Sequence, residues 1–311
     1  MLDSASKAFF HVLARSGTLK KLASRYGMRR PSSFARRFIA GESVAEAIDA
    51  ARAVEARHMT HTLDMLGESV TDLAKAEAAT RDYLEVIDAI GAAGIGRGLS
   101  LKLTQLGLDV DKAITVDNLR KILARSEPAG FFVRVDMENS PYTDVTLEIF
   151  ETLWRHGHRR IGVVLQSALH RSEQDLARLN ALGAGVRLVK GAYKEPKAIA
   201  YQHKADVDAA YARMLATLLT EGHDPAIATH DPAMIDLACK IARERGVARD
   251  TFEFQMLYGI RRDLQAKLVK EGYRVRVYIP FGREWFPYFM RRLGERPANV
   301  TFVMKGIFGE R

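Results

Sequence analysis

The chain has 311 residues, 47% of them apolar, which is enough to bury a core in one large domain or two small ones. Its single cysteine, Cys239, excludes a disulfide within the chain, and no run of 18 apolar residues is present to span a membrane. The net charge of +9 is uneven. Residues 1–40 hold nine Lys or Arg against one acid, a net +8, and the remaining residues carry +1.

Residues 1–55 are predicted to form an N-terminal basic helical arm, which ends in an amphipathic helix over 41–55. Such an arm suits an anionic membrane surface, and a solvated arm without a partner is equally expected. Nucleic acid comes third, because the rest of the chain has no basic stripe, zinc spacing or aromatic RNA-binding motif. A mitochondrial transit peptide is a minor alternative.

From residue 56 onward, short apolar segments typical of strands alternate with helical segments. The predicted strands cover residues 58–66, 99–103, 131–137, 160–165, 185–190, 225–229, 252–257 and 274–279. The predicted helices cover residues 70–93, 111–126, 142–156, 171–182, 204–221, 232–246 and 259–271, with a last helix that begins near residue 284.

Eight strand-then-helix units predict an α/β fold with a parallel sheet, and eight is the number that closes a (β/α)8 barrel of the TIM type. An open doubly wound sheet is the alternative, but it usually carries a Gly-rich phosphate loop after its first strand. The only Gly-rich cluster, residues 91–98, precedes a strand. The sequence therefore favours a barrel over residues 56–311.

Polar residues recur where seven of the eight predicted strands end, which is where barrels of this type place their active sites. They are Lys102, Asp136, Glu138, Gln166, Arg187, Lys190, Tyr193, Thr229, His230, Asp231, Gln255 and Tyr278, with Leu257 beside them. Polar groups in a core are costly unless they are paired, so this agreement indicates a binding site. The set contains no Ser-His-Asp arrangement and no metal cluster, and it favours an anionic substrate with an organic cofactor. His58 and His61 are given packing or surface roles.

The segment 276–297, RVYIPFGREWFPYFMRRLGERP, leads from the last strand into the last helix. On that helix Tyr288, Arg291, Arg292 and Glu295 share one face. A guanidinium group holds a carboxylate by two parallel charge-assisted bonds in a fixed plane, so the two adjacent arginines predict an anion receptor. Apolar residues around the same turn indicate that the receptor lies near buried surface.

Seven segments resemble, in order, characteristic segments of the proline dehydrogenase family. They are LSLKLTQLG, VRVDMENS, IGVVLQ, RLVKGAY, ATHD, EFQMLYGI and the 276–297 stretch. The resemblance covers residues 56–311 and is strongest to the monofunctional bacterial type. It implies a distorted (β/α)8 barrel with extra N-terminal helices and a last helix that carries substrate-binding arginines.

The resemblance also implies a flavoenzyme that oxidises L-proline to Δ1-pyrroline-5-carboxylate, the first step of proline catabolism to glutamate. Hydride would pass to N5 of FAD and electrons to a membrane quinone.

The resemblance also implies roles for individual residues. Substrate contacts are Lys102, Tyr193, Leu257, Tyr278, Arg291, Arg292 and Glu295. FAD contacts are Gln166, Arg187, Lys190, Thr229, His230 and Gln255. Arg187, Asp136 and Tyr278 are implied as catalytic, and no metal is expected. Asp231 stands where the family typically has Asn, and Asn139 where it has Asp, which concerns details of the cofactor contacts.

Two other functions stay open from the residues alone. One is a Schiff-base barrel enzyme of the aldolase type that uses Lys102 or Lys190. The other is a membrane or nucleic-acid adaptor driven by the basic arm. The resemblance implies a cytoplasmic enzyme at the inner membrane surface, on the matrix side in a mitochondrion, with no nucleic-acid partner. A homo-oligomer is left open.

Overall fold

The computed structural model describes residue 28 and residues 33–295, with the backbone alone at residues 34 and 293–295. Its strands are β1 (Thr60–Met65), β2 (Gly98–Leu101), β3 (Phe132–Val135), β4 (Ile161–Gln166), β5 (Gly185–Val189), β6 (His223–Ala228), β7 (Glu253–Leu257) and β8 (Arg274–Phe281). The α-helices are α3 (Val44–Glu55), α4 (Leu73–Ala93), α5 (Lys112–Ser126), α6 (Thr143–Arg155), α7 (Ser172–Ala181), α8 (Lys204–Glu221), α9 (Pro232–Arg245), α10 (Arg262–Lys270) and α11 (Trp285–Glu295). Short 3₁₀ helices are η1 (Phe34–Arg37), η2 (Thr104–Leu106) and η3 (Ser140–Tyr142).

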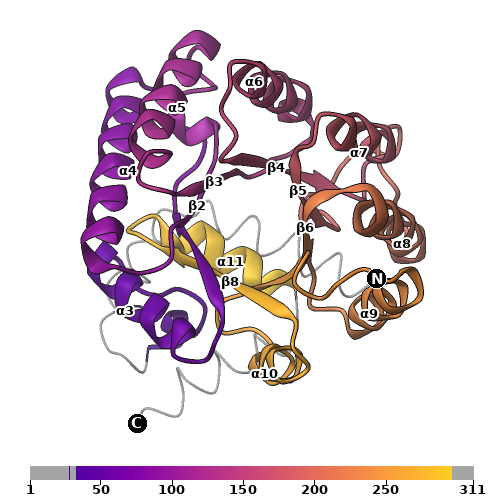
Figure 1. The fold of residues 1–311 in the computed structure, drawn as a ribbon. Coiled ribbons are helices and arrows are strands. Elements are labelled where there is room, and N and C mark those ends of the chain that lie inside the picture. Colours follow the sequence, from indigo (N-terminus) through magenta and orange to yellow (C-terminus); the bar gives the residue numbers. More distant parts are fainter. Residues whose placement is uncertain (1–27, 29–32, 296–311) are drawn as a thin grey trace.

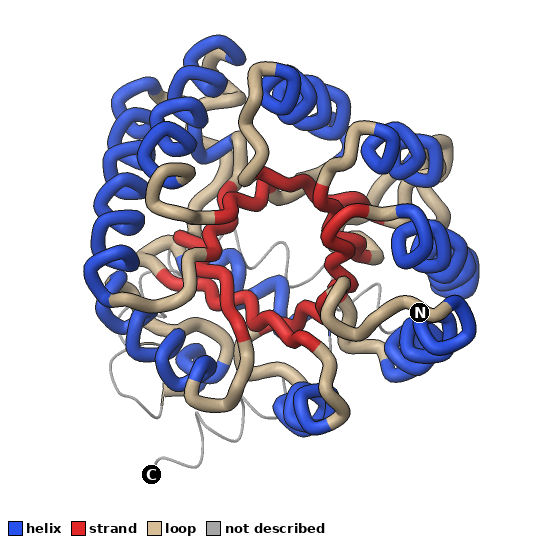
Figure 2. The backbone as a smooth tube through the Cα atoms, viewed as in Figure 1, coloured by secondary structure: helices blue, strands red, loops and turns tan. Residues whose placement is uncertain are grey.

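The eight strands form a closed parallel barrel in chain order, which confirms the predicted fold class (Figure 1). The barrel closes because β1 pairs with β8 over six positions, from Thr60 opposite Arg276 to Met65 opposite Phe281. The open doubly wound alternative is therefore wrong. Helices surround the ring of strands (Figure 2), so strands such as β4 are buried along their whole length. Every predicted strand is present, with ends shifted by a few residues.

Local sequence explains where several helices begin and end. Ser43 and Glu46 form a capping box at the start of α3, three residues later than predicted. Asp231 caps α9, whose first residue is Pro232, and α9 ends at Gly246 in the left-handed conformation. None of the helices in the described part of the chain is long and apolar enough to cross a membrane.

Helix α11 lies across the opening of the barrel, behind the ring of strands in the view of Figure 1. Its apolar side chains, among them Trp285 and Phe289, pack against Phe38 and Ile39 in a second core cluster. This packing puts the polar face of α11 at the end of the barrel.

The described part of the predicted arm packs on the barrel. Helix α3 contacts both β1 and β8, and the Ala40 amide donates to the Pro280 carbonyl at 2.9 Å. A boundary between an arm and a barrel domain at residue 55 stays a prediction. Residues 1–27 and 29–32, which carry most of the arm's charge, lie outside the described residues.

His61 on β1 is a buried histidine with a packing role. It is 1% exposed, and its Nε2 donates to Glu55 Oε1 at 3.1 Å. The same oxygen accepts from the Gly96 amide at 2.7 Å. Burial lowers the pKa of His61, although the nearby Glu55 carboxylate opposes the shift. The imidazole is therefore neutral in the folded protein.

We predict that His61 makes folding stability sensitive to pH. A lowered folded-state pKa means that the unfolded chain takes up a proton first, so stability falls as pH drops below about 6.5. In urea unfolding between about pH 7.5 and about pH 5.5, the wild type should lose more unfolding free energy than His61→Gln, whose amide keeps the donor to Glu55 without titrating. Parallel losses in the two proteins would assign the pH dependence to other groups.

Candidate active site

A cavity of about 680 Å³ lies at the carboxyl ends of the strands and reaches α11. It is lined by the predicted site residues Lys102, Asp136, Gln166, Arg187, Lys190, Tyr193, Thr229, His230, Gln255, Leu257, Tyr278, Arg291 and Arg292, together with Asp231. Seven strands and the last helix thus bring residues that are far apart in sequence to one place. The Glu295 side chain lies outside the described part of the chain.

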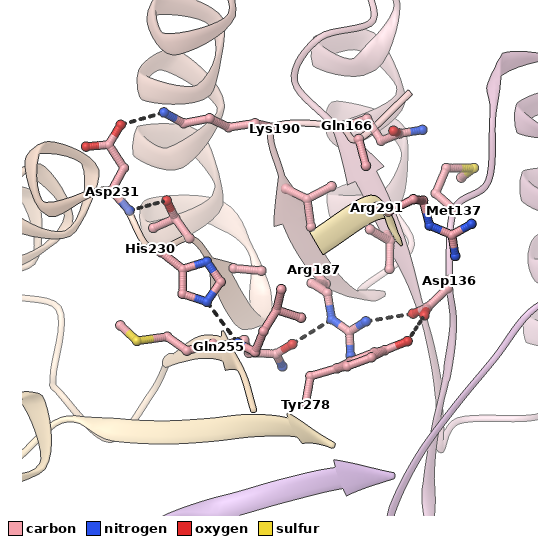
Figure 3. Close-up of a pocket in the computed structure, with 18 of the residues that line it drawn as sticks. Asp136, Met137, Gln166, Arg187, Lys190, His230, Asp231, Gln255, Tyr278 and Arg291 are labelled. Carbon is pink, nitrogen blue, oxygen red and sulfur yellow. Dashed lines mark hydrogen bonds and ion pairs between the residues drawn. The ribbon is translucent and has the colours of Figure 1, made fainter. Parts of the chain in front are cut away.

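The Arg187 guanidinium ties several strands together inside the barrel (Figure 3). Its Nε donates to Gln255 Oε1 at 2.5 Å, Nη1 donates to Asp136 Oδ1 at 2.6 Å, and Nη2 donates to Ser100 Oγ at 3.1 Å. The Tyr278 hydroxyl donates to the other Asp136 oxygen at 2.8 Å, and its ring lies 5.5 Å from the guanidinium. Arg187 is 5% exposed, so a positive charge is held in a fixed plane at the cavity wall.

Lys102 lies between two carboxylates. Its Nζ is 3.4 Å from Asp64 Oδ1 and 3.9 Å from Asp136 Oδ2. Burial disfavours the charge on Lys102, but Asp64 and Asp136 outweigh burial and raise its pKa. Asp64 is fully buried, and burial also disfavours its charged form. The pKa of Asp64 is therefore raised, although Lys102 acts in the opposite direction. Lys102 is therefore held as an ammonium ion.

The sequence analysis missed Asp64. β1 was the one strand to which it gave no site residue. The available signal was a carboxylate within a predicted core strand, since an unpaired charge there is costly.

Arg291 on α11 is held by a carboxylate from the loop between β1 and α4. Its Nη1 and Nη2 donate to the two oxygens of Glu68 at 2.7 and 3.1 Å. Burial lowers the pKa of Arg291, and Glu68 more than compensates, so the pKa is raised overall. The bidentate geometry expected of a carboxylate receptor is thus present, with a side chain of the protein in it. Glu68 was not predicted, because nothing in residues 66–72 indicates where that loop folds.

Several residues predicted to contact the cofactor form a second group in the cavity. Lys190 Nζ donates to Asp231 at 2.6 Å (Figure 3). It also donates to Asp208 at 2.5 Å. The hydrogen bond from Lys190 lowers the pKa of Asp231, whose other oxygen caps α9. A carboxylate at position 231 therefore serves two partners at once. Asp208, on α8, was missed by the sequence analysis.

His230 and Gln166 are oriented by the backbone. His230 Nε2 accepts from the Leu257 amide at 2.9 Å, which places the imidazole proton on Nδ1. Gln166 Nε2 donates to the Glu138 carbonyl at 2.9 Å. Each side chain thus has a defined orientation at the cavity wall.

We predict that Lys102→Met destabilises the fold because it leaves Asp64 and Asp136 without a shared cation. Removing one partner of a buried pair costs about 3–5 kcal/mol, which urea unfolding at about pH 8 should show. The deficit should shrink as pH falls, because a carboxyl group whose folded-state pKa is raised binds its proton more tightly in the folded state. The double variant Lys102→Met/Asp64→Asn should recover much of the loss. No recovery would mean that Asp64 does not carry the uncompensated charge.

The chain is similar to proteins of one known family. A family model described as Proline dehydrogenase matches residues 47–305. Proline dehydrogenase 2 of Bacillus subtilis (strain 168) is 41% identical over 302 residues, 97% of this chain and 98% of that protein. Proline dehydrogenase of Deinococcus radiodurans is 45% identical over 279 residues, 88% of this chain and 90% of that protein. A crystal structure of proline utilization A (PutA) from Bdellovibrio bacteriovorus, inactivated by N-propargylglycine, is similar with a TM-score of 0.79 and 28% identity. That match covers 89% of this chain but only 34% of the longer PutA chain.

Proposed function

The chain belongs to the proline dehydrogenase family, and we propose that it oxidises L-proline to Δ1-pyrroline-5-carboxylate with FAD as the hydride acceptor. One observation carries the proposal. Lys102, Arg291 and Arg292 line the same cavity as Arg187 and Gln255. The three cations suit a carboxylate substrate, and the buried polar groups of Arg187 and Gln255 suit the polar edge of an aromatic cofactor.

The donor set fits a flavin. A flavin ring has two apolar faces and an edge of nitrogen and oxygen atoms, and the cavity wall combines Val164, Val189 and Met256 with polar side chains. The residues that would hold FAD are Gln166, Arg187, Lys190, Thr229, His230 and Gln255. When bound, FAD supplies the acceptor for the hydride and stores the electrons. Arg187, fixed by Asp136 and Gln255, would stabilise the negative charge that reduction adds.

The substrate residues supply binding and orientation. Arg291, Arg292 and Lys102 would hold the carboxylate of proline. For this, Arg291 must exchange Glu68 for the substrate, one bidentate carboxylate pair for another. The fixed carboxylate then decides which ring carbon faces the flavin.

Other side chains would shape the rest of the substrate site. Tyr278 and Leu257 would pack on the pyrrolidine ring, with Tyr193 beside them. The hydroxyl of Tyr278 is tied to Asp136, so its ring is already oriented toward the cavity. Glu295 is proposed as a further carboxylate on this side.

The Schiff-base alternative is less well supported. A nucleophilic lysine needs a neutral amine, which desolvation or a neighbouring cation normally provides. Lys102 instead has a raised pKa because Asp64 and Asp136 outweigh its burial, and Lys190 is bound to two carboxylates. An adaptor function leaves the buried polar cavity without a role.

We further propose that electrons pass from the flavin to a quinone in the membrane. A quinone dissolved in a bilayer requires the enzyme to visit the surface, and the net charge of +8 on residues 1–40 suits an anionic one. Each Lys or Arg near such a surface contributes about 1 kcal/mol and is screened by salt. The enzyme would then work at the cytoplasmic face of the inner membrane, or at the matrix face in a mitochondrion.

The first test is the absorbance spectrum. We expect the purified protein to carry FAD, to be bleached by L-proline without oxygen, and to be reoxidised by a quinone in anionic vesicles. N-propargylglycine, which inactivates the Bdellovibrio protein, should inactivate this one, and L-proline should protect it. A colourless protein that FAD cannot reconstitute, or a flavin that L-proline leaves oxidised, would contradict the proposed function.

Replacing the clamp tests the substrate side. Arg291→Met and Arg292→Met should each raise the KM for L-proline. The fall in kcat/KM should correspond to about 2–4 kcal/mol of lost transition-state stabilisation, because a charge-assisted contact is lost. FAD content should stay near that of the wild type. Arg261→Met is a matched control, since this arginine lines the same cavity but pairs with Asp263. If the clamp variants behave like that control, the pair is not the carboxylate receptor.

A further inference from the structure

The loop between β5 and α8, residues 190–203, forms a strap over the barrel end. Its far part is fixed by backbone bonds to the loop after β4. The His170 amide donates to the Ile199 carbonyl at 3.0 Å, and the Tyr201 amide donates to the Ala168 carbonyl at 2.9 Å. A bridge between Leu169 and Ala200 lies between these bonds. This end of the strap therefore has several anchors.

The first residue of the strap, Lys190, is anchored, because its carbonyl accepts from the Ala168 amide at 2.9 Å. The middle of the strap, residues 191–198, has one side chain that reaches outside it. Both oxygens of Glu195 accept from Ser140, at 2.8 Å from its amide and 2.5 Å from its hydroxyl. Among the described residues, Glu195 is the only side chain of residues 191–198 with a recorded hydrogen bond outside the strap. Ser140 begins η3, in the loop that follows β3 and carries Asp136. The Glu195–Ser140 contact thus joins the loops after β3 and β5.

Tyr193 precedes Glu195 by two residues and is the largest strap side chain that lines the cavity. It lines the cavity with Lys102 and Arg291. Burial raises the pKa of its phenol to about 12, and the Arg291 charge acts in the opposite direction. The neighbours on either side of it, Ala192 and Lys194, are exposed. Tyr193 itself is half-buried, so its place in the cavity depends on where the strap is held.

We propose that Glu195 is a positioning residue, which holds the strap to Ser140 and so places Tyr193 over the substrate carboxylate site. The inference rests on the proposed function. Two charge-assisted bonds at once fix the carboxylate in direction as well as in distance. Without them, no side chain of residues 191–198 has a hydrogen bond to a described residue outside the strap. Tyr193 then has no fixed position before the substrate binds.

The test compares graded variants of Glu195 in the FAD-loaded, full-length protein. Glu195→Ala should raise the KM for L-proline by about tenfold, because substrate binding must then supply the free energy that orders the strap. Glu195→Gln should fall between it and the wild type, since its carbonyl still accepts from the Ser140 amide. kcat should change by less than about twofold, because Arg291, Arg292 and Lys102 still orient the bound substrate. Glu173→Gln, which breaks the exposed pair with Arg213, is the control.

A double-mutant cycle tests whether Glu195 acts through Tyr193. In a Tyr193→Ala background, Glu195→Ala should change KM by less than about twofold, because the side chain that it positions is gone. Additive effects, or a Glu195→Ala variant with wild-type KM, would overturn the inference while proline turnover by the wild type still supports the proposed function. A wild type whose flavin L-proline does not reduce overturns both.

Discussion

The buried guanidinium of Arg187 is the interaction on which the site depends. It joins β5 to side chains from β2, β7 and the end of β3, and through Asp136 it also fixes Tyr278 on β8. A buried charge is tolerated when it is paired and hydrogen-bonded, and here each of the three guanidinium nitrogens donates a hydrogen bond. The same bonds that make the charge tolerable set the relative position of five strands. The polar layer is therefore part of the fold as well as part of the site.

The charges around the cavity are arranged in two groups with different partners. Lys102 and Arg187 share Asp136 in the barrel interior, while Arg291 is brought in from α11 and holds Glu68. The interior group is held by strands and is preorganised. The α11 group depends on a helix and a loop that pack outside the barrel, so it can exchange partners without disturbing the strands. The proposed clamp, which would release a protein carboxylate before it accepts that of the substrate, would be suited to such an element.

The barrel was predictable from the sequence because its elements are locally encoded. The β-rich segments between amphipathic helices predicted all eight strands. Because barrels place their sites at the carboxyl ends of the strands, the residues there, from Lys102 to Tyr278, were predicted to form one site. These residues share one cavity because parallel strands all end at one side of the barrel. Arg291 and Arg292 were found by their shared face on a helix. Each of these predictions relied on a periodic pattern in the sequence or on the predicted end of a strand.

The residues that the sequence did not predict are the hydrogen-bonding and ion-pair partners of other residues, and tertiary packing determines such partners. Asp64, Glu68, Asp208 and Glu195 each complete an ion pair or hydrogen bond with a residue distant in sequence or on another element. Glu68 and Glu195 lie in loops, whose paths follow no period, and Asp208 is a half-buried residue near the start of α8. Residue type predicts that a buried Lys102 or Arg291 needs a carboxylate, because an unpaired charge is costly. Only the packing of one loop against another decides which carboxylate it is, and that choice fixes how the cations meet a substrate.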